Sequence, residues 1–399
     1  MMKRLRTVIF WAHLVTGLSA AAIVVIMSAT GVLLTYQRQV QSWADTRGLD
    51  GSRGATGAAA LSPEALLERT AGARAERPTA LRWRRDPAAP VEVMYGREHT
   101  LFVNGYTGEI LGSGSERARA FFRGVTDWHR WLALSGDGRS RGRAVTGAAN
   151  LAFLVIVLAG FFLWWPRKLT ARALRRSLWF RRGLRGKARD FNWHNVIGIW
   201  SVVPLVLVIL SAVVISYAWA GALVERIAGA NAAAGPERWA PAEQTTAATA
   251  DGPPGAAALL GRARARMPDW QSLTMEVVPR DGNVVFVLDG GHGGQPHRQA
   301  RLTLNAATGA VVRWEPFSSG ARAQRLRSIL RYMHTGEVLG VGGQTVAGAA
   351  SAGAMVLAWT GVSLALRRLR AWLGRRRRFR RPRAAGQEGA KGRDADHDR

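Results

Sequence analysis

Apolar residues are concentrated in four long runs, and the segments between the runs are polar. The runs are long enough to form helices that cross roughly 30 Å of hydrocarbon, which takes about 20 residues. The first run is too long for the core of a signal peptide and has no obvious small-residue cleavage site, so we expect it to be retained. The predicted transmembrane helices are residues 8–36, 145–165, 193–219 (apolar from Val196) and 346–366.

Basic residues flank these runs in blocks. Arginine and lysine are dense in the first six residues, in the loop 166–192 and in the tail 367–399. With four crossings all three blocks lie on one side, and cytoplasmic flanks are the ones rich in Lys and Arg. We therefore expect an inner-membrane protein with both termini in the cytoplasm, and with segments 37–144 and 220–345 in the periplasm of a Gram-negative cell.

The amino-acid composition limits the partners and the metal sites that this protein can have. The 399 residues are 48% hydrophobic and carry a formal net charge of +29. Because the basic residues lie beside apolar runs, the charge indicates membrane topology and a lipid bilayer as partner, with no nucleic acid. The absence of cysteine excludes disulfides, thiolate-held iron–sulfur clusters and covalent haem attachment through C-x-x-C-H. Any metal must be held by histidine, by carboxylate or in a non-covalent cofactor.

The two outer segments are predicted to form small α+β domains, at 37–128 and 220–325. Ser62 and Pro63 suit the N-cap and first turn of a helix. Each domain ends in a strand, a Thr-Gly turn and another strand, and the glycine supplies the positive φ of a tight hairpin. Helices are expected at 61–73 and 253–267, and strands at 90–96, 99–111, 272–279, 283–291 and 298–314.

The chain contains an internal repeat. The unit is helix, external domain, interfacial segment (129–144 or 326–345) and helix, used twice. The predicted fold is thus a membrane protein with a four-helix transmembrane bundle built from two repeats and two external α+β domains. Pairs offset by 201 residues are Thr107 and Thr308, Gly108 and Gly309, Gly147 and Gly348, and Gly160 and Gly361, and His13 and Gly17 match His194 and Gly198.

Four of the eight histidines occur at related places in the two halves. His13 and His194 lie at the start of the first and third spans, whereas His129 and His334 lie between each external domain and its following span. Polar groups at membrane depth persist mainly where they face the bundle interior and have a partner. Two imidazoles at one depth could supply both axial ligands of a haem iron. We therefore predict two non-covalent b-type haems, one on the cytoplasmic side (His13, His194) and one on the periplasmic side (His129, His334).

Gly17 and Gly198 support the haem hypothesis. Each lies one helical turn after its histidine on the same face, so the missing side chain leaves room for a flat macrocycle. The alternative is that the histidines are interfacial residues beside an aromatic belt formed by Trp11, Trp128 and Trp193.

The remaining histidines carry weaker signals. His292 and His297 lie in the glycine-rich stretch "GGHGGQPHRQ", which is more typical of a solvated turn than of a metal site. His99 lies in a predicted strand and His397 in the tail. No dinucleotide or P-loop motif is present, so we expect neither flavin nor nicotinamide to be bound by this chain.

The sequence resembles the PepSY-associated transmembrane family, which includes iron-regulated inner-membrane proteins and ferric-siderophore reductases. The resemblance runs from about Arg4 to Arg370 and is carried by "WAHLVTGL", "DWHRWLAL", "NWHNVIG", "MHTGEVLG", "VNGYTGEIL" and "LNAATGAVV". It implies four spans, two periplasmic PepSY domains and haem held by membrane histidines, which here are His13, His129, His194 and His334. Some relatives carry a cytoplasmic flavoprotein module that this chain lacks, so the electron donor is expected to be a separate cytoplasmic flavoprotein or quinol.

The resulting hypothesis is a di-haem cytochrome b that acts as a ferric reductase, passing electrons to the periplasmic face to reduce a ferric siderophore or another ferric chelate. One alternative is a quinol-linked cytochrome with a different periplasmic acceptor. Another is a non-redox protein whose PepSY domains bind a peptide or partner. Transport of the intact chelate is disfavoured, because four spans that hold two haems leave little room for a substrate pathway.

Overall fold

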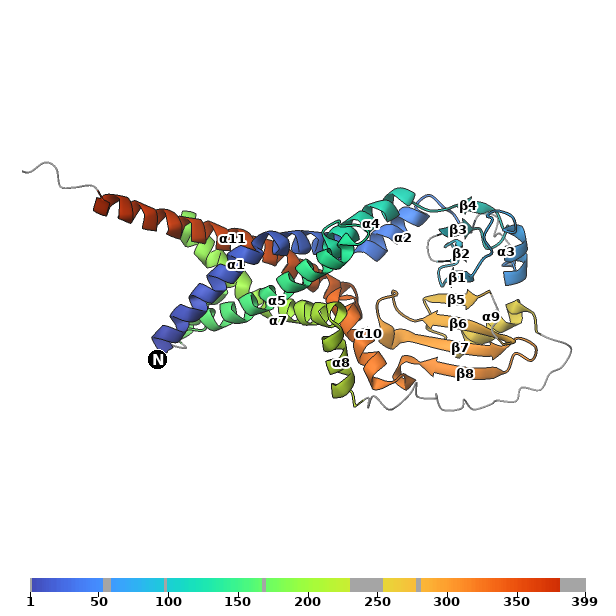
Figure 1. Cartoon of the computed structure of the whole chain (residues 1–399). Helices are drawn as coiled ribbons and strands as arrows, with labels where there is room; N and C mark the ends of the chain where they lie inside the picture. Colours follow the sequence, from blue (N-terminus) through green and yellow to red (C-terminus); the bar gives the residue numbers. More distant parts are fainter. Residues whose placement is uncertain are drawn as a thin grey trace, which may run out of the picture.

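The molecule is elongated, with a bundle of long helices at one end and a β-sheet at the other (Figure 1). The computed structural model describes residues 2–52, 59–96, 99–166, 170–229, 254–277 and 281–380. His397 lies outside the described residues.

Within the described residues, four helices are long and apolar enough to cross a membrane, as expected of a membrane protein. Each extends beyond its predicted apolar run into a flanking segment that contains arginine, because Arg and Lys continue a helix at little cost. The four helices are α1 (Met2–Leu34), α5 (Gly138–Trp164), α7 (Gly186–Ser216) and α11 (Gly340–Arg380).

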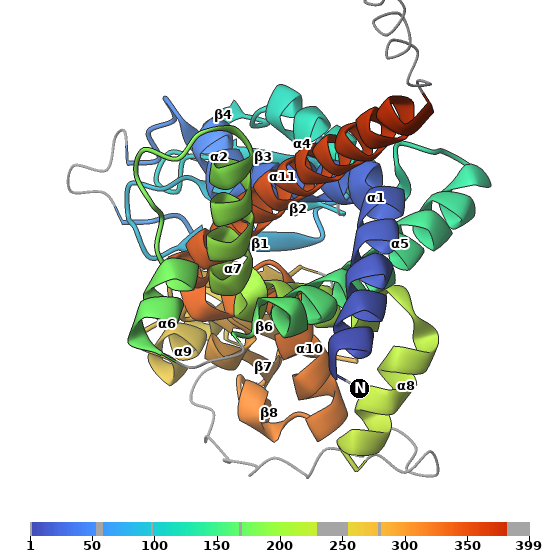
Figure 2. The same cartoon turned by 90° about the vertical axis from the view of Figure 1, so that its left-hand side faces the viewer.

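The long helices form a closed ring in which α1 packs on α5 and α11, and α7 packs on the same two helices. Helices α1 and α7 therefore stand at opposite corners of the bundle. Figure 2 looks along the bundle from the end that carries the N-terminus. The centre is filled by Leu205 and Ile209 of α7 together with Ala350 and Ala354 of α11, whose small side chains let the helices approach closely.

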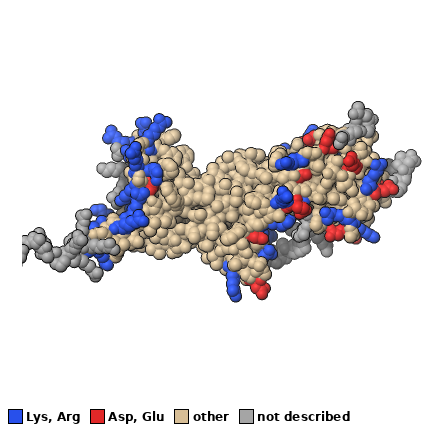
Figure 3. Space-filling model, turned by 90° about the horizontal axis from the view of Figure 1, so that it is seen from above, with Lys and Arg blue, Asp and Glu red and all other residues tan. Residues whose placement is uncertain are grey.

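Charge divides the surface along the long axis (Figure 3). Lysine and arginine gather at the bundle end, a band without charged side chains follows, and acidic and basic residues mix at the sheet end. The band exposes large apolar side chains such as Val155 and Val203. An exposed apolar belt between charged ends is the surface expected of a bundle embedded in lipid.

Shorter helices connect the bundle to the sheet. Helices α2 and α8 directly follow α1 and α7, while α4 and α10 precede α5 and α11. Helix α6 lies in the loop between α5 and α7. Their bounds are α2 Gln37–Thr46, α4 Glu116–Trp131, α6 Ala171–Leu178, α8 Ala218–Ile227, α10 Arg322–His334 and the 3-10 turn η3 Glu337–Leu339.

The strands form one antiparallel sheet of eight, in the order β4-β3-β2-β1-β5-β6-β7-β8. Helices α3 (Pro63–Arg69) and α9 (Ala256–Arg266) contribute buried leucines to a single core with the strands. The strands are β1 Ala80–Arg84, β2 Val91–Tyr95, β3 His99–Val103, β4 Ile110–Gly112, β5 Ser272–Glu276, β6 Asn283–Asp289, β7 Gln299–Asn305 and β8 Val311–Pro316.

The central pair of the sheet, β1 and β5, joins the two outer segments. Leu81 of β1 lies opposite Met275 of β5, and Trp83 lies opposite Leu273. The sequence analysis predicted neither β1 nor this joint, and it treated the segments as separate domains. The core residues of both segments are therefore one continuous cluster.

The two Thr-Gly turns have the same internal hydrogen bonds. The Asn104 side chain accepts from the backbone N–H of Tyr106 and Thr107. The Asn305 side chain makes the equivalent pair of bonds. Gly108 and Gly309 have φ of +73° and +67°, so the predicted positive φ is confirmed. The predicted N-cap at Ser62 is also confirmed, because its hydroxyl accepts from Ala65 N–H.

Truncation of Leu81 to alanine tests the shared core. Leu81 is fully buried, so Leu81→Ala is expected to lower the free energy of unfolding by about 2–5 kcal/mol. Urea unfolding of the detergent-solubilised protein, followed by near-ultraviolet circular dichroism, measures the loss. Ile110 on the edge strand β4 is 42% exposed, and Ile110→Ala should cost below about 1 kcal/mol. Equal losses in the two variants would contradict a core centred on the β1–β5 joint.

Candidate functional site

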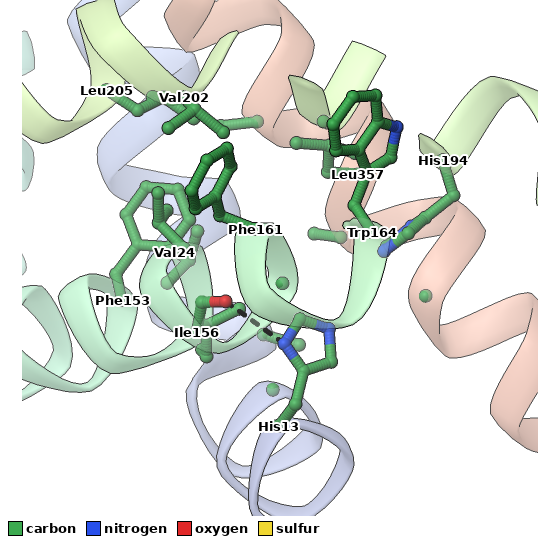
Figure 4. A pocket seen from close by; sticks show the side chains of 18 of the residues that line it. His13, Val24, Phe153, Ile156, Phe161, Trp164, His194, Val202, Leu205 and Leu357 are labelled. Carbon is green, nitrogen blue, oxygen red and sulfur yellow. Dashed lines mark hydrogen bonds between the residues drawn. The ribbon is translucent and has the colours of Figure 1, made fainter. Parts of the chain in front are cut away.

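The four histidines matched in the sequence meet as two pairs. The ring centres of His13 and His194 are 6.3 Å apart with an interplanar angle of 88°. The ring centres of His129 and His334 are 6.1 Å apart with an angle of 53°. Figure 4 shows His13 and His194 at one pocket. We call the first pair the lower tier, on the side of the basic end, and the second pair the upper tier, on the side of the sheet.

Each tier takes one imidazole from each half of the chain. In the lower tier His13 lies on α1 and His194 on α7, at opposite corners of the bundle. In the upper tier His129 is in the last turn of α4 and His334 is the last residue of α10. Helix α4 packs on α1 and α5, and α10 packs on α7, so these imidazoles also approach from opposite sides.

Backbone carbonyls orient one histidine in each tier. His13 Nδ1 lies 3.0 Å from the carbonyl oxygen of Ile156 on α5 (Figure 4). His334 Nδ1 lies 3.0 Å from the carbonyl oxygen of Val208 on α7. Since a carbonyl can only accept, Nδ1 donates in both cases, and the neutral ring keeps its lone pair on Nε2.

Threonine hydroxyls orient the other two histidines. Thr30 Oγ1 is 2.9 Å from His129 Nδ1 and donates its own hydrogen to the Ile26 carbonyl at 2.7 Å. Thr360 Oγ1 is 2.9 Å from His194 Nδ1 and donates to the Val356 carbonyl at 2.7 Å. Because each hydroxyl has one hydrogen, both accept from Nδ1. All four imidazoles therefore have the tautomer that leaves Nε2 free to bind a metal.

Glycines make room for the lower imidazoles. A Cβ on Gly160 would lie 3.2 Å from His13 Cε1, and one on Gly361 would lie 3.5 Å from His194 Cε1. Gly160 lies one helical turn after Ile156. Because Gly160 has no side chain, the His13 ring can approach the carbonyl oxygen of Ile156. A Cβ on Gly17 would meet nothing within 4 Å, and Gly17 and Gly198 both line the cavity beside the pair. A Cβ on Gly198 would lie 3.7 Å from Leu357 Cδ2, so Gly17 borders open space and Gly198 does not, and clearance for a haem at the two glycines stays a prediction.

A cavity accompanies each tier. The lower cavity encloses about 940 Å³ and the upper about 860 Å³, including space open to the surroundings. Both are lined mainly by apolar side chains, and Val24, Phe153 and Leu205 line both. These three side chains form a thin apolar partition between the tiers. Stacked cavities with facing imidazoles can hold two flat apolar cofactors one above the other.

The paired imidazoles have the separation that one shared iron requires. A metal–imidazole bond of about 2.0 Å, with the ring centre about 1.1 Å behind the nitrogen, places two axial imidazole centres about 6 Å apart. Both tiers match this spacing. Burial, followed by the proximity of His334, lowers the pKa of His129 to about 4, so the ring is neutral at pH 7 as a metal ligand must be. The residues of both tiers therefore fit bis-histidine haem.

Asp190 lies one turn before His194 on α7 and is fully buried. Its carboxylate pairs with Arg189 at 2.9 Å and with Arg367 of α11 at 3.1 Å, and accepts from Ser363 at 3.0 Å. This network ties α7 to α11 near the lower tier. Asp190 was not predicted as a site residue from the sequence. Its position, as a single carboxylate among arginines just before an apolar segment, could have indicated a buried ion pair.

The other described histidines stay apart from the tiers. His292 and His297 are exposed in the stretch between β6 and β7, and His99 is a partly exposed residue of β3. Among the described residues, no group of three or more His, Asp or Glu side chains has an arrangement that could hold a metal ion without a cofactor.

The fold and the site define a class: a four-helix membrane protein with an external antiparallel sheet and two tiers of facing histidines. The family described as the PepSY-associated TM region matches residues 10–368, and the chain belongs to that family. No curated protein matches the sequence.

Asp190→Ala tests the network beside the lower tier. The change removes the acceptor shared by two arginines and a serine, and should lower the free energy of unfolding in detergent by about 1–3 kcal/mol. The control is Asp127→Ala, because Asp127 is 43% exposed and lies 3.8 Å from Arg139, so its loss should be below about 0.5 kcal/mol. Equal effects would show that the Asp190 network adds no more than a surface pair.

Proposed function

We propose that this protein is a di-haem b-type cytochrome that carries electrons across the membrane. The observation that carries the proposal is the spacing of the two histidine pairs, 6.3 Å and 6.1 Å between ring centres. The four Nδ1 hydrogen bonds add to it, because they direct Nε2 of each ring toward coordination. A haem with two histidine ligands accepts and donates one electron without binding oxygen.

Interfacial histidines account less well for this arrangement. A side chain that serves only the membrane interface has no need of a second imidazole across the bundle axis or of a fixed tautomer. The cavities support the same choice, because each one adjoins a facing pair of imidazoles and is lined mainly by apolar side chains, as an apolar cofactor requires.

We interpret the chain as two copies of one unit. In each half a long helix is followed by a short helix, a further short helix, four antiparallel strands, a helix and a second long helix. The matched Thr-Gly turns and the contribution of one histidine per half to each tier support this interpretation. Duplication explains how a single chain presents two imidazoles to one iron.

The orientation follows from charge. The positive-inside rule favours the cytoplasm for the basic end of the bundle, and residues 2 and 380, which lie at that end, would then be cytoplasmic. The sheet then lies in the periplasm of a bacterial inner membrane. The lower tier faces the cytoplasmic donor, and the upper tier faces the periplasm. The two tiers divide the hydrocarbon thickness into shorter steps, separated by the partition of Val24, Phe153 and Leu205.

The periplasmic acceptor is proposed to be a ferric chelate, such as a ferric siderophore. One electron converts chelated Fe(III) to Fe(II), and oxygen chelators hold Fe(II) far more weakly, so reduction releases the metal. The electron is supplied by a reduced cytoplasmic flavoprotein or by membrane quinol. Resemblance to the reductases of the family supports the ferric acceptor, and the competing proposal is a quinol-linked cytochrome with a different periplasmic acceptor.

Haem content tests the histidine pairs. Purified wild-type protein should contain about two haems per chain by pyridine haemochrome. His13→Ala and His194→Ala should each remove the lower haem, and His129→Ala and His334→Ala the upper one, as resolved by potentiometric titration. His292→Ala and His297→Ala are the matched controls, since both side chains are exposed, and should keep both haems. Pigment-free wild type, or equal losses in the controls, would refute the assignment.

The acceptor is tested by reoxidation. Dithionite-reduced protein freed of excess reductant and mixed with a ferric chelate should lose its α-band while a ferrous-specific dye captures Fe(II), with about one electron passed per haem. His334→Ala should slow this at least tenfold, because the upper tier lies between the lower tier and the periplasm. Reoxidation by a copper salt or a periplasmic protein but not by the ferric chelate would favour the competing acceptor.

A further inference from the structure

We propose that a cleft between the sheet and the start of α10 binds the carboxylate-type oxygens of an anionic ferric chelate. The inference rests on the proposed function and names the place where its substrate docks. The cleft lies against β6, β7 and β8 on one side and α10 on the other, and encloses about 740 Å³, including open space. That volume suits a small chelate or one arm of a larger one.

Two arginines supply the positive charge. Arg325 of α10 and Arg301 of β7 line the cleft. The Nε of Arg325 is buried and has no hydrogen-bond partner among the described residues. The guanidinium of Arg325 makes no hydrogen bond or ion pair with a described residue, so its terminal nitrogens can donate to an oxygen anion in the cleft. Arg301 makes only a long 3.4 Å contact with Glu276, so its guanidinium can turn to a ligand.

Uncharged donors surround the arginines. Gln324 and Ser328 line the same cleft and can donate hydrogen bonds to carboxylate oxygens, whereas the Gln299 amide already donates to Asp289 and to the Gly293 carbonyl. Helix α10 has no side-chain cap at its first turn, so its N-terminal amides add a weak positive field at this end.

One carboxylate opposes the anion. Glu315 lines the cleft, and its side chain lies 3.6 Å from Arg313, which offsets part of its charge. The charged lining residues are thus two arginines and one glutamate. Val287, Pro296 and Phe317 add an apolar wall, so the site favours an anion that also presents carbon surface over a bare inorganic ion.

The position of the cleft suits an electron acceptor. Helix α10 begins at the cleft and ends at His334 of the upper tier. His334 is nine positions after Arg325, which is about 13.5 Å along the helix axis. A single helix, α10, therefore joins the cleft to the upper tier.

The test uses gallium citrate, a redox-inactive analogue of ferric citrate, titrated into the purified haem-loaded protein by calorimetry. Arg325→Gln and Arg301→Gln should each raise the dissociation constant at least tenfold, since each removes a charge-assisted hydrogen bond. Arg327→Gln is the matched control on the same helix, because Arg327 pairs with Glu225 of α8 at 2.8 Å and does not line the cleft. The control should bind as wild type does.

Folding is checked by the haem spectrum and the melting temperature, and Ser328→Trp, which fills the cleft, replaces any arginine variant that fails to fold. No binding to wild type, or equal weakening in Arg327→Gln, would overturn the inference. Binding in the cleft without reoxidation of reduced protein by ferric citrate would leave the docking site intact and refute the ferric reductase. Normal reoxidation in the arginine variants would refute the docking site alone.

Discussion

The structure depends on the hydrogen bond that each paired imidazole makes through Nδ1. Every acceptor lies on a different helix from its histidine: Ile156 for His13, Thr360 for His194, Thr30 for His129 and Val208 for His334. The orientation of each ring therefore depends on the packing of the helices, because a shift of a long helix would move an acceptor away from its ring. Satisfied partners also explain how four polar groups persist in an apolar bundle.

Ties at both ends of the bundle hold these distances. At the basic end the buried carboxylate of Asp190 links α7 to α11 through Arg367 and Ser363. At the other end the β1–β5 pair joins the two halves of the sheet, from which α4 and α10 lead to the upper tier. The β1–β5 pair links the two halves at the sheet end, and the Asp190 network keeps α7 against α11 at the basic end, so both ties limit changes in the spacing of the facing rings.

The sequence predicted the elements with strong local patterns and missed those that depend on partners. Apolar run length gave the four long helices, and Thr-Gly turns marked both hairpins. It also matched His13 with His194, which the structure places together, while the haem they are proposed to hold stays a prediction. Strand β1 was missed because two of its five residues are arginine, and these charges find partners only when β1 pairs with β2 and β5. Thr30 and Thr360 were missed because their role exists only once another helix supplies the imidazole.

The position of β1 has a consequence for biogenesis. Its hydrogen-bonding partner β5 belongs to the second half of the chain, so β1 has an open strand edge until the second half has been synthesised. Unpaired edges are templates for association with other chains. Arg82 and Arg84, two cations on this short strand, make it a poor template for a neighbouring copy, and in the finished protein both pair with Glu92. Until β5 is made, two charged side chains on this strand therefore disfavour pairing of the open edge with another copy.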